Sequence, residues 1–422
     1  MKYESAFSSY LAYQDTQSNW LGRIPSIWKV QAFRRVATIL NGADHKPFEV
    51  DEGGFPVFGS GGEFARCKQY LSRGPSLLLG RKGTINRPLF VEEPFWAVDT
   101  TYYTKFGTGC FAKFFHYVAL ACFPLDMYTY GSALPSMTQR DYYTFPVPVP
   151  SPNEQLIIST FLDRETTRID ALITKQNRLI ALLDEKRQAV ISHAVTKGLD
   201  SNVPVKDSGI EWLGEVPAHW KILPVKRTAH KITDGAHISP ETEDGKYAFV
   251  STRDIRGKGI DFQNCLMTSE SSFDYLVHSG CAPQLGDVLF SKDGTIGKTV
   301  VVSDDRPFVV ASSLIIIRPD RSVALSVFLD YVLSSSHVLA LVDLAVKGAG
   351  LPRLSIQNLQ KVIVIVPPLI EQEAIVAFLD HATEKIDTLI EKAKQSIELM
   401  KERRSALISA AVTGKIDVRE LV

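Results

Sequence analysis

The sequence has few cysteines, and they form no pattern that would build a cross-link or a metal site. Five are scattered along 422 residues and never form a C-x-x-C pair; they are Cys67, Cys110, Cys122, Cys265 and Cys281. Such spacing suggests neither a disulfide framework nor a zinc site. We therefore expect reduced, partly buried thiols and no metal.

A long apolar run is also missing. No stretch of eighteen consecutive apolar residues occurs, and the first residues, MKYESAFSSYLAYQDTQ, lack the basic-then-apolar order of a signal peptide. We expect a cytoplasmic protein without a membrane partner. At 45% hydrophobic and 22% charged residues, a chain of 422 residues has room for two or three domains that each bury a core.

The chain has no excess of either charge, with 47 basic and 47 acidic residues. Binding to nucleic-acid phosphates is usually driven by clustered Lys and Arg, so this balance argues mildly against such a partner. Within the chain only residues 1–152 are net basic, with 15 Lys and Arg against 12 Asp and Glu. A DNA-binding function would therefore depend on local patches or on partner subunits.

Two enzyme signatures are absent or incomplete. The stretch SKDGTIGKT, residues 291–299, resembles a phosphate-binding loop, but that loop needs two glycines five positions apart and Lys292 stands five before Gly297. The segment GRKGTI, residues 80–85, has the same Gly-Thr-Ile core, which favours a repeat over a nucleotide site. Neither an Asn/Asp-Pro-Pro-aromatic string nor a glycine-rich cofactor turn, as an adenine methyltransferase needs, occurs.

An internal repeat organises the whole chain. Residues 15–37, DTQSNWLGRIPSIWKVQAFRRVA, match residues 207–229, DSGIEWLGEVPAHWKILPVKRTA, at 9 of 23 positions. Residues 154–200 match residues 371–417 at 23 of 47 positions without a gap. Between these frames only short echoes persist: the Gly-Thr-Ile loops, and Leu-Pro at 134–135 and 351–352. Constant frames around divergent inserts indicate two recognition modules, although a duplicated scaffold remains possible.

The longer repeat predicts two amphipathic helices. From Ile169 onward the apolar residues recur about every 3.5 positions, which is typical of a helix that packs lengthwise against another helix. Gly198 and Gly414 stand where helix stops belong. About 30 residues make a rod of roughly 45 Å. The residues expected to pack or to dock partner subunits are Ile169, Leu172, Ile173, Leu183, Ile386, Leu389, Ile390 and Met400.

The two helices are the obvious partners for each other. Packed antiparallel, they would place the two inserts at opposite ends about a pseudo-two-fold axis, and half-sites about 34 Å apart on a duplex match a rod of that size. A coiled coil that serves only stability or dimerisation remains an alternative.

The inserts read as mixed strands with a few helices. Short apolar and β-branched runs broken by Gly, Pro and Asp indicate strands, for example PSLLLGRKGTI and PFVVASSLIIIRP, whereas residues 111–123 and 326–342 look helical. We predict an α+β fold with two mixed α/β globular domains, joined by two long helices that form an antiparallel coiled coil. The boundaries are 1–152 and 204–367 for the globular domains, and 153–203 and 368–422 for the helical spacers.

Several glycine-containing loops carry basic or hydroxyl side chains that suit a phosphate or a base edge. They lie at residues 58–63, 80–85, 234–241, 251–260 and 292–299. Each loop alone is a weak signal, but basic residues recur at the same place in both Gly-Thr-Ile loops. The predicted DNA-contacting residues are Ser60, Arg81, Lys82, Thr84, His237, Thr252, Arg253, Lys292, Thr295 and Lys298.

Three phrases give the chain a resemblance to a known family. The frame DSGIEWLGEVPAHW, the helix start PP-x-x-EQ-x-x-I-x-x-FLD and the helix end EKRQAVISHAVTKGLD resemble the DNA specificity subunit of type I restriction-modification systems, and the order of segments agrees along nearly the whole chain. The first frame, DTQSNWLGRIPSIW, lacks the Gly-Ile-Glu of the second.

The resemblance implies a non-catalytic reader of double-stranded DNA. In that family each recognition domain reads one half of a split, asymmetric target through the major groove. The helix pair sets the gap and docks two modification subunits, which methylate adenine with S-adenosylmethionine. Restriction subunits, which use ATP with Mg, join that core, and the specificity subunit itself binds no cofactor.

Two other classes stay open on sequence alone. One is an enzyme, either a nucleotide hydrolase acting through residues 291–299 or a self-contained methyltransferase. The other is a protein-interaction scaffold built on the coiled coil without a DNA role.

Overall fold

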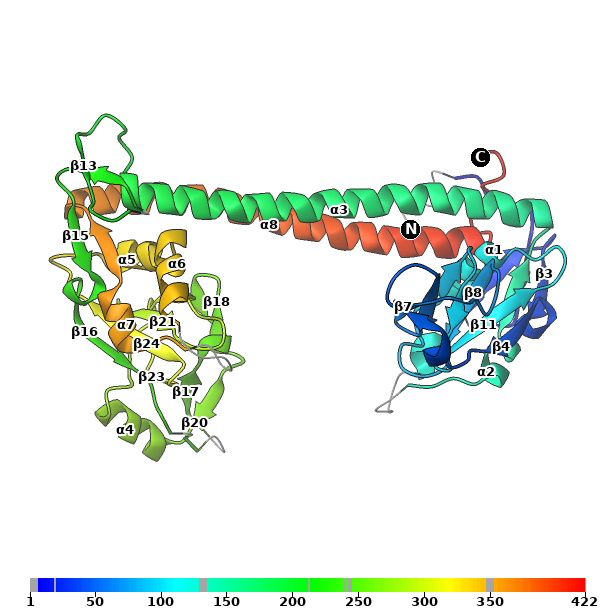
Figure 1. Cartoon of the computed structure of the whole chain (residues 1–422), viewed down its shortest axis with the longest axis horizontal. Helices are drawn as coiled ribbons and strands as arrows, with labels where there is room; N and C mark the ends of the chain where they lie inside the picture. Colours follow the sequence, from blue (N-terminus) through cyan, green and yellow to red (C-terminus); the bar gives the residue numbers. More distant parts are fainter. Residues whose placement is uncertain are drawn as a thin grey trace. The chain divides into compact units, whose positions relative to one another are not determined.

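The computed structural model of the chain describes residues 7–18, 20–128, 135–211, 213–238, 240–241, 245–346 and 353–421. The chain divides into two compact units. Unit 1 consists of Met1–Asn177 and Lys394–Val422, and unit 2 of Arg178–Ala393. Each unit contains one α+β globular domain and one stretch of each long helix (Figure 1).

The two predicted spacer segments are single, unusually long helices. Helix α3 spans Pro152–Lys197 with 46 residues, and α8 spans Leu369–Val412 with 44 residues. At 1.5 Å per residue these lengths are about 69 and 66 Å, so the expected length of about 30 residues is wrong. The helices extend further because the residues before the 3.5-residue repeat stay helical and pack into a globular domain, as Ile158 and Phe161 do in unit 1.

The ends of both helices follow from local sequence. Pro152 is the first helical residue of α3, a position where its missing N–H costs nothing. At the other ends Gly198 and Gly414 have φ of +81° and +67°, the left-handed region that glycine enters without strain. The predicted stops are confirmed.

Within unit 2 the stretches of α3 and α8 run antiparallel. Leu183 clusters with Ile390, and further along α3 Val195 shares a core cluster with Leu379. The position on α8 therefore falls as the position on α3 rises. The pairing buries these aliphatic side chains, each to 8% exposure or less.

Unit 1 has the same helix direction. Leu162 of α3 and Val412 of α8 belong to one core cluster, and further along α3 Asp170 accepts from Arg404 of α8, with Nε–Oδ1 at 2.9 Å. Antiparallel packing, predicted from the sequence repeat, therefore holds in each unit.

The strands of unit 1 form two four-stranded sheets and two pairs. The sheet orders are β4-β11-β8-β9 and β10-β6-β7-β5, and the pairs are β1-β2 and β3-β12 among the described residues. The bounds are β1 Tyr13–Asp15, β2 Arg23–Pro25, β3 Lys29–Ala32, β4 Ala37–Asn41, β5 Glu49–Val50, β6 Phe55–Gly59, β7 Gly62–Cys67, β8 Ser76–Gly80, β9 Leu89–Val91, β10 Trp96–Ala97, β11 Thr101–Phe106 and β12 Pro146–Val149. Its short helices are α1 Ala112–Cys122 and α2 Gln139–Thr144.

Unit 2 repeats this plan. Its sheet orders are β16-β24-β21-β22 and β20-β17-β23, with the pairs β13-β14, β15-β25 and β18-β19 among the described residues. The strand bounds are β13 Val205–Asp207, β14 Glu215–Pro217, β15 Lys221–Pro224, β16 Ala229–Asp234, β17 Tyr247–Val250, β18 Ile255–Arg256, β19 Gly259–Ile260, β20 Leu266–Thr268, β21 Val288–Ser291, β22 Thr299–Val301, β23 Phe308–Val310, β24 Leu314–Pro319 and β25 Ile363–Val366. The helices are α4 Glu270–His278, α5 Ser326–Leu333, α6 Ser336–Ala345 and α7 Ile356–Lys361.

Strand pairing extends the repeat beyond what the sequence reveals. The sheet β4-β11-β8-β9 corresponds to β16-β24-β21-β22, and the one parallel pair described in each unit, β6 with β10 and β17 with β23, is also shared. The hairpin β18–β19 and the helices α4 and α6 have no counterpart among the described residues of unit 1. These additions account for the longer second insert.

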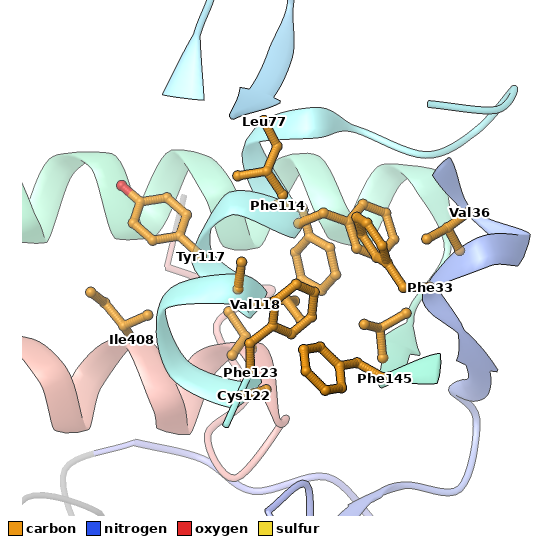
Figure 2. Close-up of a cluster of buried hydrophobic side chains, with 14 of the residues drawn as sticks. Phe33, Val36, Leu77, Phe114, Tyr117, Val118, Cys122, Phe123, Phe145 and Ile408 are labelled. Carbon is orange, nitrogen blue, oxygen red and sulfur yellow. The ribbon is translucent and has the colours of Figure 1, made fainter. Parts of the chain in front are cut away.

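Each globular domain closes its core on both long helices. In unit 1 an aromatic cluster contains Phe33, Phe114 of α1 and Phe123, which follows α1. Ile408 of α8 belongs to the same core, and Figure 2 shows it near Tyr117 of α1. Full burial of such a side chain contributes about 1.5–3 kcal/mol. The hydrophobic core of the domain therefore includes side chains of both long helices.

Two helix expectations have different outcomes. The helix predicted over 111–123 is confirmed as α1. The helix predicted over 326–342 is not continuous, because it breaks at Ser334 and Ser335 into α5 and α6. Ser335 Oγ donates to the Val332 carbonyl oxygen and so competes with the backbone hydrogen bonds of a continuous helix.

In the part of the chain that the structure describes, no single helix can span a membrane. Helices α5 and α6, bent by 62°, reach the required length and composition only as a pair.

The tryptophan frames lie against the helices. Trp28 and Trp220 are equivalent and both buried, and Trp220 Nε1 donates to Glu371 Oε2 of α8 at 2.9 Å. Trp212 of the second frame, and Leu134, Leu351 and Pro352 of the Leu-Pro echo, lie outside the described residues.

The loop that resembles a nucleotide site is a β-hairpin. Residues 291–299 connect β21 to β22, which pair antiparallel with Phe290 opposite Thr299. A phosphate-binding loop instead leads from a strand into a helix, whose N-terminus holds the phosphate. The nucleotide-hydrolase alternative is wrong for this reason.

Candidate nucleic-acid interface

Four of the predicted DNA-contacting residues meet in one place in unit 1. We call loop cluster 1 the set Ser60, Arg81, Lys82, Gly83 and Thr84. Ser60 lies at the turn between β6 and β7, and its Oγ would stand 3.2 Å from a Cβ placed on Gly83. The backbone of the 81–84 loop is fixed by its neighbours, since Arg81 N donates to Thr100 O at 2.9 Å. Lys82 and Thr84 are exposed, and Arg81 is half-exposed.

The equivalent place in unit 2 holds four of the six DNA-contacting residues predicted for that unit. We call loop cluster 2 the set His237, Thr252, Arg253, Lys292 and Ser313. Both Thr252 and Lys292 bind Ser313: Thr252 N donates to Ser313 Oγ at 3.2 Å and Lys292 N to Ser313 O at 2.9 Å. Arg253 is exposed beside them and His237 lies exposed on the neighbouring loop.

The last two predicted residues belong to the β21–β22 hairpin. Ser291 Oγ donates to Thr295 O at 2.6 Å, and Lys298 N donates to Ser291 Oγ at 2.8 Å. These bonds fix the turn. Thr295 is exposed and Lys298 half-exposed, so both side chains can be reached from outside.

Lys292 is engaged inside loop cluster 2. It is only 4% exposed, and its Nζ forms an ion pair with Asp234, which also binds His237 Nε2 at 2.7 Å. Burial acts to raise the pKa of Asp234, but the hydrogen bond and charge of Lys292 outweigh it and hold that pKa below its usual range. A direct contact of Lys292 with DNA would require this pair to open, whereas Arg81 has no such carboxylate partner among the described residues.

A shared Gly-Ala turn escaped the sequence comparison. Asn-Gly-Ala-Asp at 41–44 and Asp-Gly-Ala-His at 234–237 end equivalent strands, β4 and β16. A Cβ on Gly42 would lie 2.0 Å from Val98 O, and one on Gly235 would lie 2.2 Å from Ala311 O. Only glycine fits such close backbone approach. Two four-residue strings with two identities are too short to detect without the fold.

A buried glutamine clamps each domain to its helix. Gln155 Oε1 accepts from Phe111 N at 2.9 Å, and its Nε2 donates to Gly109 O and Pro150 O. Gln372 makes the same three bonds in unit 2, with Leu325 N, Val323 O and Pro367 O. Both glutamines are fully buried. The signal was present in the sequence as the shared Glu-Gln at each helix start.

A tyrosine and an aspartate form a second junction in each unit. In unit 1, Tyr117 OH of α1 donates to Asp163 Oδ1 of α3 at 2.8 Å, and Lys113 Nζ lies 2.8 Å from Asp163 Oδ2. The Asp belongs to the Phe-Leu-Asp string that both helices share. The lysine neutralises a carboxylate that is taken partly out of water.

The matching junction in unit 2 corrects one predicted loop. Tyr331 OH donates to Asp380 Oδ1 at 2.7 Å, and Lys258 Nζ, in the loop predicted to contact DNA, lies 2.9 Å from the same oxygen. Burial acts to raise the pKa of Asp380, yet the hydrogen bonds from Lys258 and Tyr331 bring it below its usual value. The β18–β19 turn therefore packs back onto α8, so only the start of loop 251–260 belongs to loop cluster 2.

The eight predicted spacer residues divide into two kinds. Six are buried or half-buried: Ile169, Ile173, Leu183, Ile386, Ile390 and Met400. Of these, Leu183 of α3 forms one cluster with Ile386 and Ile390 of α8. The other two, Leu172 and Leu389, are 44% and 50% exposed. These two occupy equivalent positions in the repeat, as do Leu182 and Leu399, which are 44% and 65% exposed. We call these four residues the outer leucines.

Two equivalent ion pairs join the helices. Asp170 pairs with Arg404 in unit 1, and Asp387 with Arg187 in unit 2, where Nε–Oδ1 is 3.1 Å. In both pairs the residue numbers add up to 574, as expected when one antiparallel register applies in both units. Exposed pairs contribute only about 0–1 kcal/mol each, so they specify the register more than they stabilise it.

Among the residues that the structure describes, the His, Cys, Asp and Glu side chains are the candidates for holding a metal ion where several of them meet. No group of three or more His, Cys, Asp or Glu there is placed to hold a metal ion. All five cysteines are described and free, with Cys67, Cys122 and Cys281 buried.

Comparison with known proteins relates both units to one family. The family model described as type I restriction modification DNA specificity domain matches residues 25–181 and 227–399. The chain is 21% identical over 351 residues to the type I restriction enzyme EcoBI specificity subunit of Escherichia coli, covering 81% of this chain and 73% of that protein. It is 24% identical over 316 residues to the MjaVIII specificity subunit of Methanocaldococcus jannaschii, covering 70% and 68%.

A shorter match and a solved structure complete the comparison. A specificity subunit from Haemophilus influenzae is 31% identical over 121 residues, and the match spans 29% of this chain and 30% of that relative. A solved structure from work on complex assembly and conformational transition of the type I R-M system matches with a TM-score of 0.68 at 16% identity. It covers 92% of this chain and 98% of the solved chain, and at this identity the likeness concerns the fold alone.

Proposed function

Because the chain belongs to the family of type I restriction-modification DNA specificity subunits, a non-catalytic family that binds no cofactor itself, we propose that it reads a bipartite, asymmetric double-stranded DNA target. Residues 1–152 read one half of the target and residues 204–367 the other. Residues 153–203 and 368–422 are the spacers that separate them. As a reader of cellular DNA the protein works in the cytoplasm.

The observation that carries this proposal is that equivalent positions of the two domains hold different side chains. In unit 2, Asp234 binds both Lys292 and His237 of loop cluster 2. The equivalent residue of unit 1 is Asn41, which forms no such ion pair among the described residues. Base edges in the major groove differ in their donors and acceptors. Two domains with the same frame and different side chains therefore suit two different half-sites.

The exposed cations supply the part of binding that does not depend on sequence. Lys82 in unit 1 and Arg253 in unit 2 are exposed and form no ion pair with any described residue, so they suit phosphate oxygens. Replacement of either by alanine is expected to weaken binding to all sequences alike and to reduce its salt dependence. Hydroxyls and His237 are better suited to base edges.

The outer leucines are the proposed docking surface for partner subunits. Leucines this exposed on two helices, at positions equivalent by the repeat, suit two copies of an apolar helical partner. The partners are two modification subunits, which methylate adenine with S-adenosylmethionine, joined by restriction subunits that use ATP with Mg.

Docking can be tested without disturbing the fold. The double variant Leu172→Glu, Leu389→Glu should lower the affinity for the modification subunit at least about tenfold in a binding titration, since a carboxylate resists burial in an apolar contact. Asn177→Glu, which adds a single carboxylate at another exposed position of α3, should bind normally. Equal affinities of both proteins would contradict this docking surface.

The reading function is tested by methylome sequencing of cells that carry this chain and its modification subunits. The expected result is one split motif with one adenine modified on each strand. Exchange of residues 38–150 for another insert should change only one half of that motif. A change in both halves would refute modular reading, and a random-duplex selection that enriches no sequence would favour a scaffold.

A further inference from the structure

Asn41, which is exposed, and Gln139, which is half-exposed, form a pair of amide side chains beside loop cluster 1. Asn41 ends β4, and Gln139 is the first residue of α2. Gln139 Nε2 donates to Asn41 Oδ1 at 3.2 Å. The segment before Gln139 runs next to the 81–84 loop, because Met137 N donates to Arg81 O and Gly83 N to Pro135 O. The amide pair therefore lies on the same edge of the domain as the predicted DNA-contacting residues.

The pair has unused hydrogen-bonding capacity. Among the described residues neither amide makes a second side-chain hydrogen bond, which leaves the Asn41 Nδ2 donors and the Gln139 Oε1 acceptor without a protein side-chain partner. An adjacent donor and acceptor are complementary to adenine, which offers the N7 acceptor and the N6 donor in the major groove. Guanine offers two acceptors there, N7 and O6, so it leaves the glutamine oxygen without a donor.

Rigid neighbours hold the two amides in place. Thr138 caps α2 with a full capping box through Asp141, and the fully buried Tyr142 of α2 donates from its OH to Gly80 O at 2.8 Å. Ile39 N of β4 donates to Tyr143 OH of α2 at 2.8 Å. Since the Tyr143 bond already joins α2 to β4 and the Tyr142 bond joins α2 to Gly80 of β8, the amide pair is not needed to hold α2 in place. Preorganised side chains on strands and helices are what selective recognition requires.

The equivalent position in unit 2 has different chemistry. There Asp234 takes the place of Asn41 and is occupied by Lys292 and His237. A carboxylate that already has two partners does not offer the donor and acceptor of an amide. The two halves of the target are thus read by different groups at this position.

We infer that the Asn41–Gln139 pair is a specificity determinant that reads an adenine in the half-site bound by unit 1. This inference rests on the proposed function and adds to it the base class and the residues for one position of the target. The amide pair acts in discrimination between bases, whereas phosphate contacts set the overall affinity.

The test uses the full chain in complex with its modification subunits. Duplexes carry the mapped target with each base pair of both halves replaced in turn, and methylation rates are measured for each duplex. Gln139→Ala and Asn41→Ala are each expected to reduce the preference at one A·T pair of one half by about 5- to 100-fold. The preferences in the other half, and the affinity for unrelated DNA, should stay as in the parent protein.

Gln357→Ala is the matched control. Gln357 is an exposed glutamine on α7, which is the counterpart of α2 in unit 2, and its replacement should leave the half-site of unit 1 unchanged. Retained discrimination in the other half, with an unchanged melting temperature, shows that a variant is folded. If both variants keep every preference in the first half within about twofold of the parent, the inference is wrong while the reading function stands. If the parent itself recognises no split target, both fail.

Discussion

At the scale of single residues, buried polar side chains join each domain to its helices. Gln155 and Gln372 are fully buried, and each pairs with one backbone N–H and two backbone carbonyls. A buried group left without its partner costs about 1–3 kcal/mol. The glutamines therefore hold each domain in one orientation on its helix. An apolar residue at either position would leave one N–H and two carbonyls without this partner.

Gln372→Leu should lower the free energy of unfolding by roughly 2–5 kcal/mol, because one N–H and two carbonyls lose their partner while the side-chain volume stays similar. Urea unfolding followed by circular dichroism measures the change. Gln263→Ala, an exposed glutamine of the same unit, should shift it by less than about 0.5 kcal/mol. Similar values for both variants would mean that the clamp has no energetic role.

His116 predicts a pH dependence. Burial first of all, and then the charge of Arg404, lowers its pKa from 6.5 to about 4, with Asp163 acting in the opposite direction and Lys113 in the same one. Between these values the unfolded chain binds a proton that the folded chain does not, so stability falls as the pH drops from about 7 to 4. Burial lowers the pKa of His337 in unit 2 to about 4 as well, so it contributes in the same direction.

His116→Phe should reduce this loss without abolishing it, since His337 remains. Urea unfolding at pH 7.5 and pH 5 gives the difference for parent and variant. The Asp234 carboxyl does not interfere, because its lowered pKa affects stability only below about pH 4. An equal difference in the two proteins would contradict a buried, neutral His116.

At the scale of elements, one helix carries two apolar faces with different roles. The 3.5-residue repeat left pairs of neighbouring candidates, such as Leu172 with Ile173 and Leu389 with Ile390. The structure assigns the isoleucine of each pair to the inner face and leaves the leucine 44% or 50% exposed. Sequence periodicity alone could not separate them, because residues one position apart differ by only about 100° around a helix.

Ile390→Ala and Leu389→Ala form a matched pair on adjacent residues. The first should cost about 2–4 kcal/mol of unfolding free energy, because it opens a cavity between the helices. The second should cost less than about 0.5 kcal/mol and act instead on association with the modification subunit. Thermal or urea unfolding and a binding titration check the two effects, and a reversed order would refute the assignment of faces.

At the scale of the whole molecule, the helices are expected to set the unread gap of the target. The ion pairs Asp170–Arg404 and Arg187–Asp387 share one register, so an insertion into α3 alone would break it. Both helices must be lengthened together.

Seven extra residues at Gln176, matched by seven at Ile397, should lengthen the gap by about three base pairs. A heptad keeps the inner faces aligned and adds about 10 Å, against 3.4 Å per base pair. Methylome sequencing reads the new motif, whose two halves should keep their bases. Insertion of three residues at each site turns the inner apolar faces of α3 and α8 away from each other and should destabilise the protein. If the heptad variant keeps the parent's gap, the helices do not act as the spacer.

The sequence by itself determined the duplication, the two long helices with their glycine stops, the α+β class and most of the loops that gather at one edge of each domain. These follow from local periodicity and from repeated strings. Only the tertiary structure decided which leucines face outward, that Lys292 is paired with Asp234 and that Lys258 turns back onto α8. It also brought Asn41 to Gln139. The physical reason is that exposure and pairing depend on residues far apart in the chain, which no local pattern records.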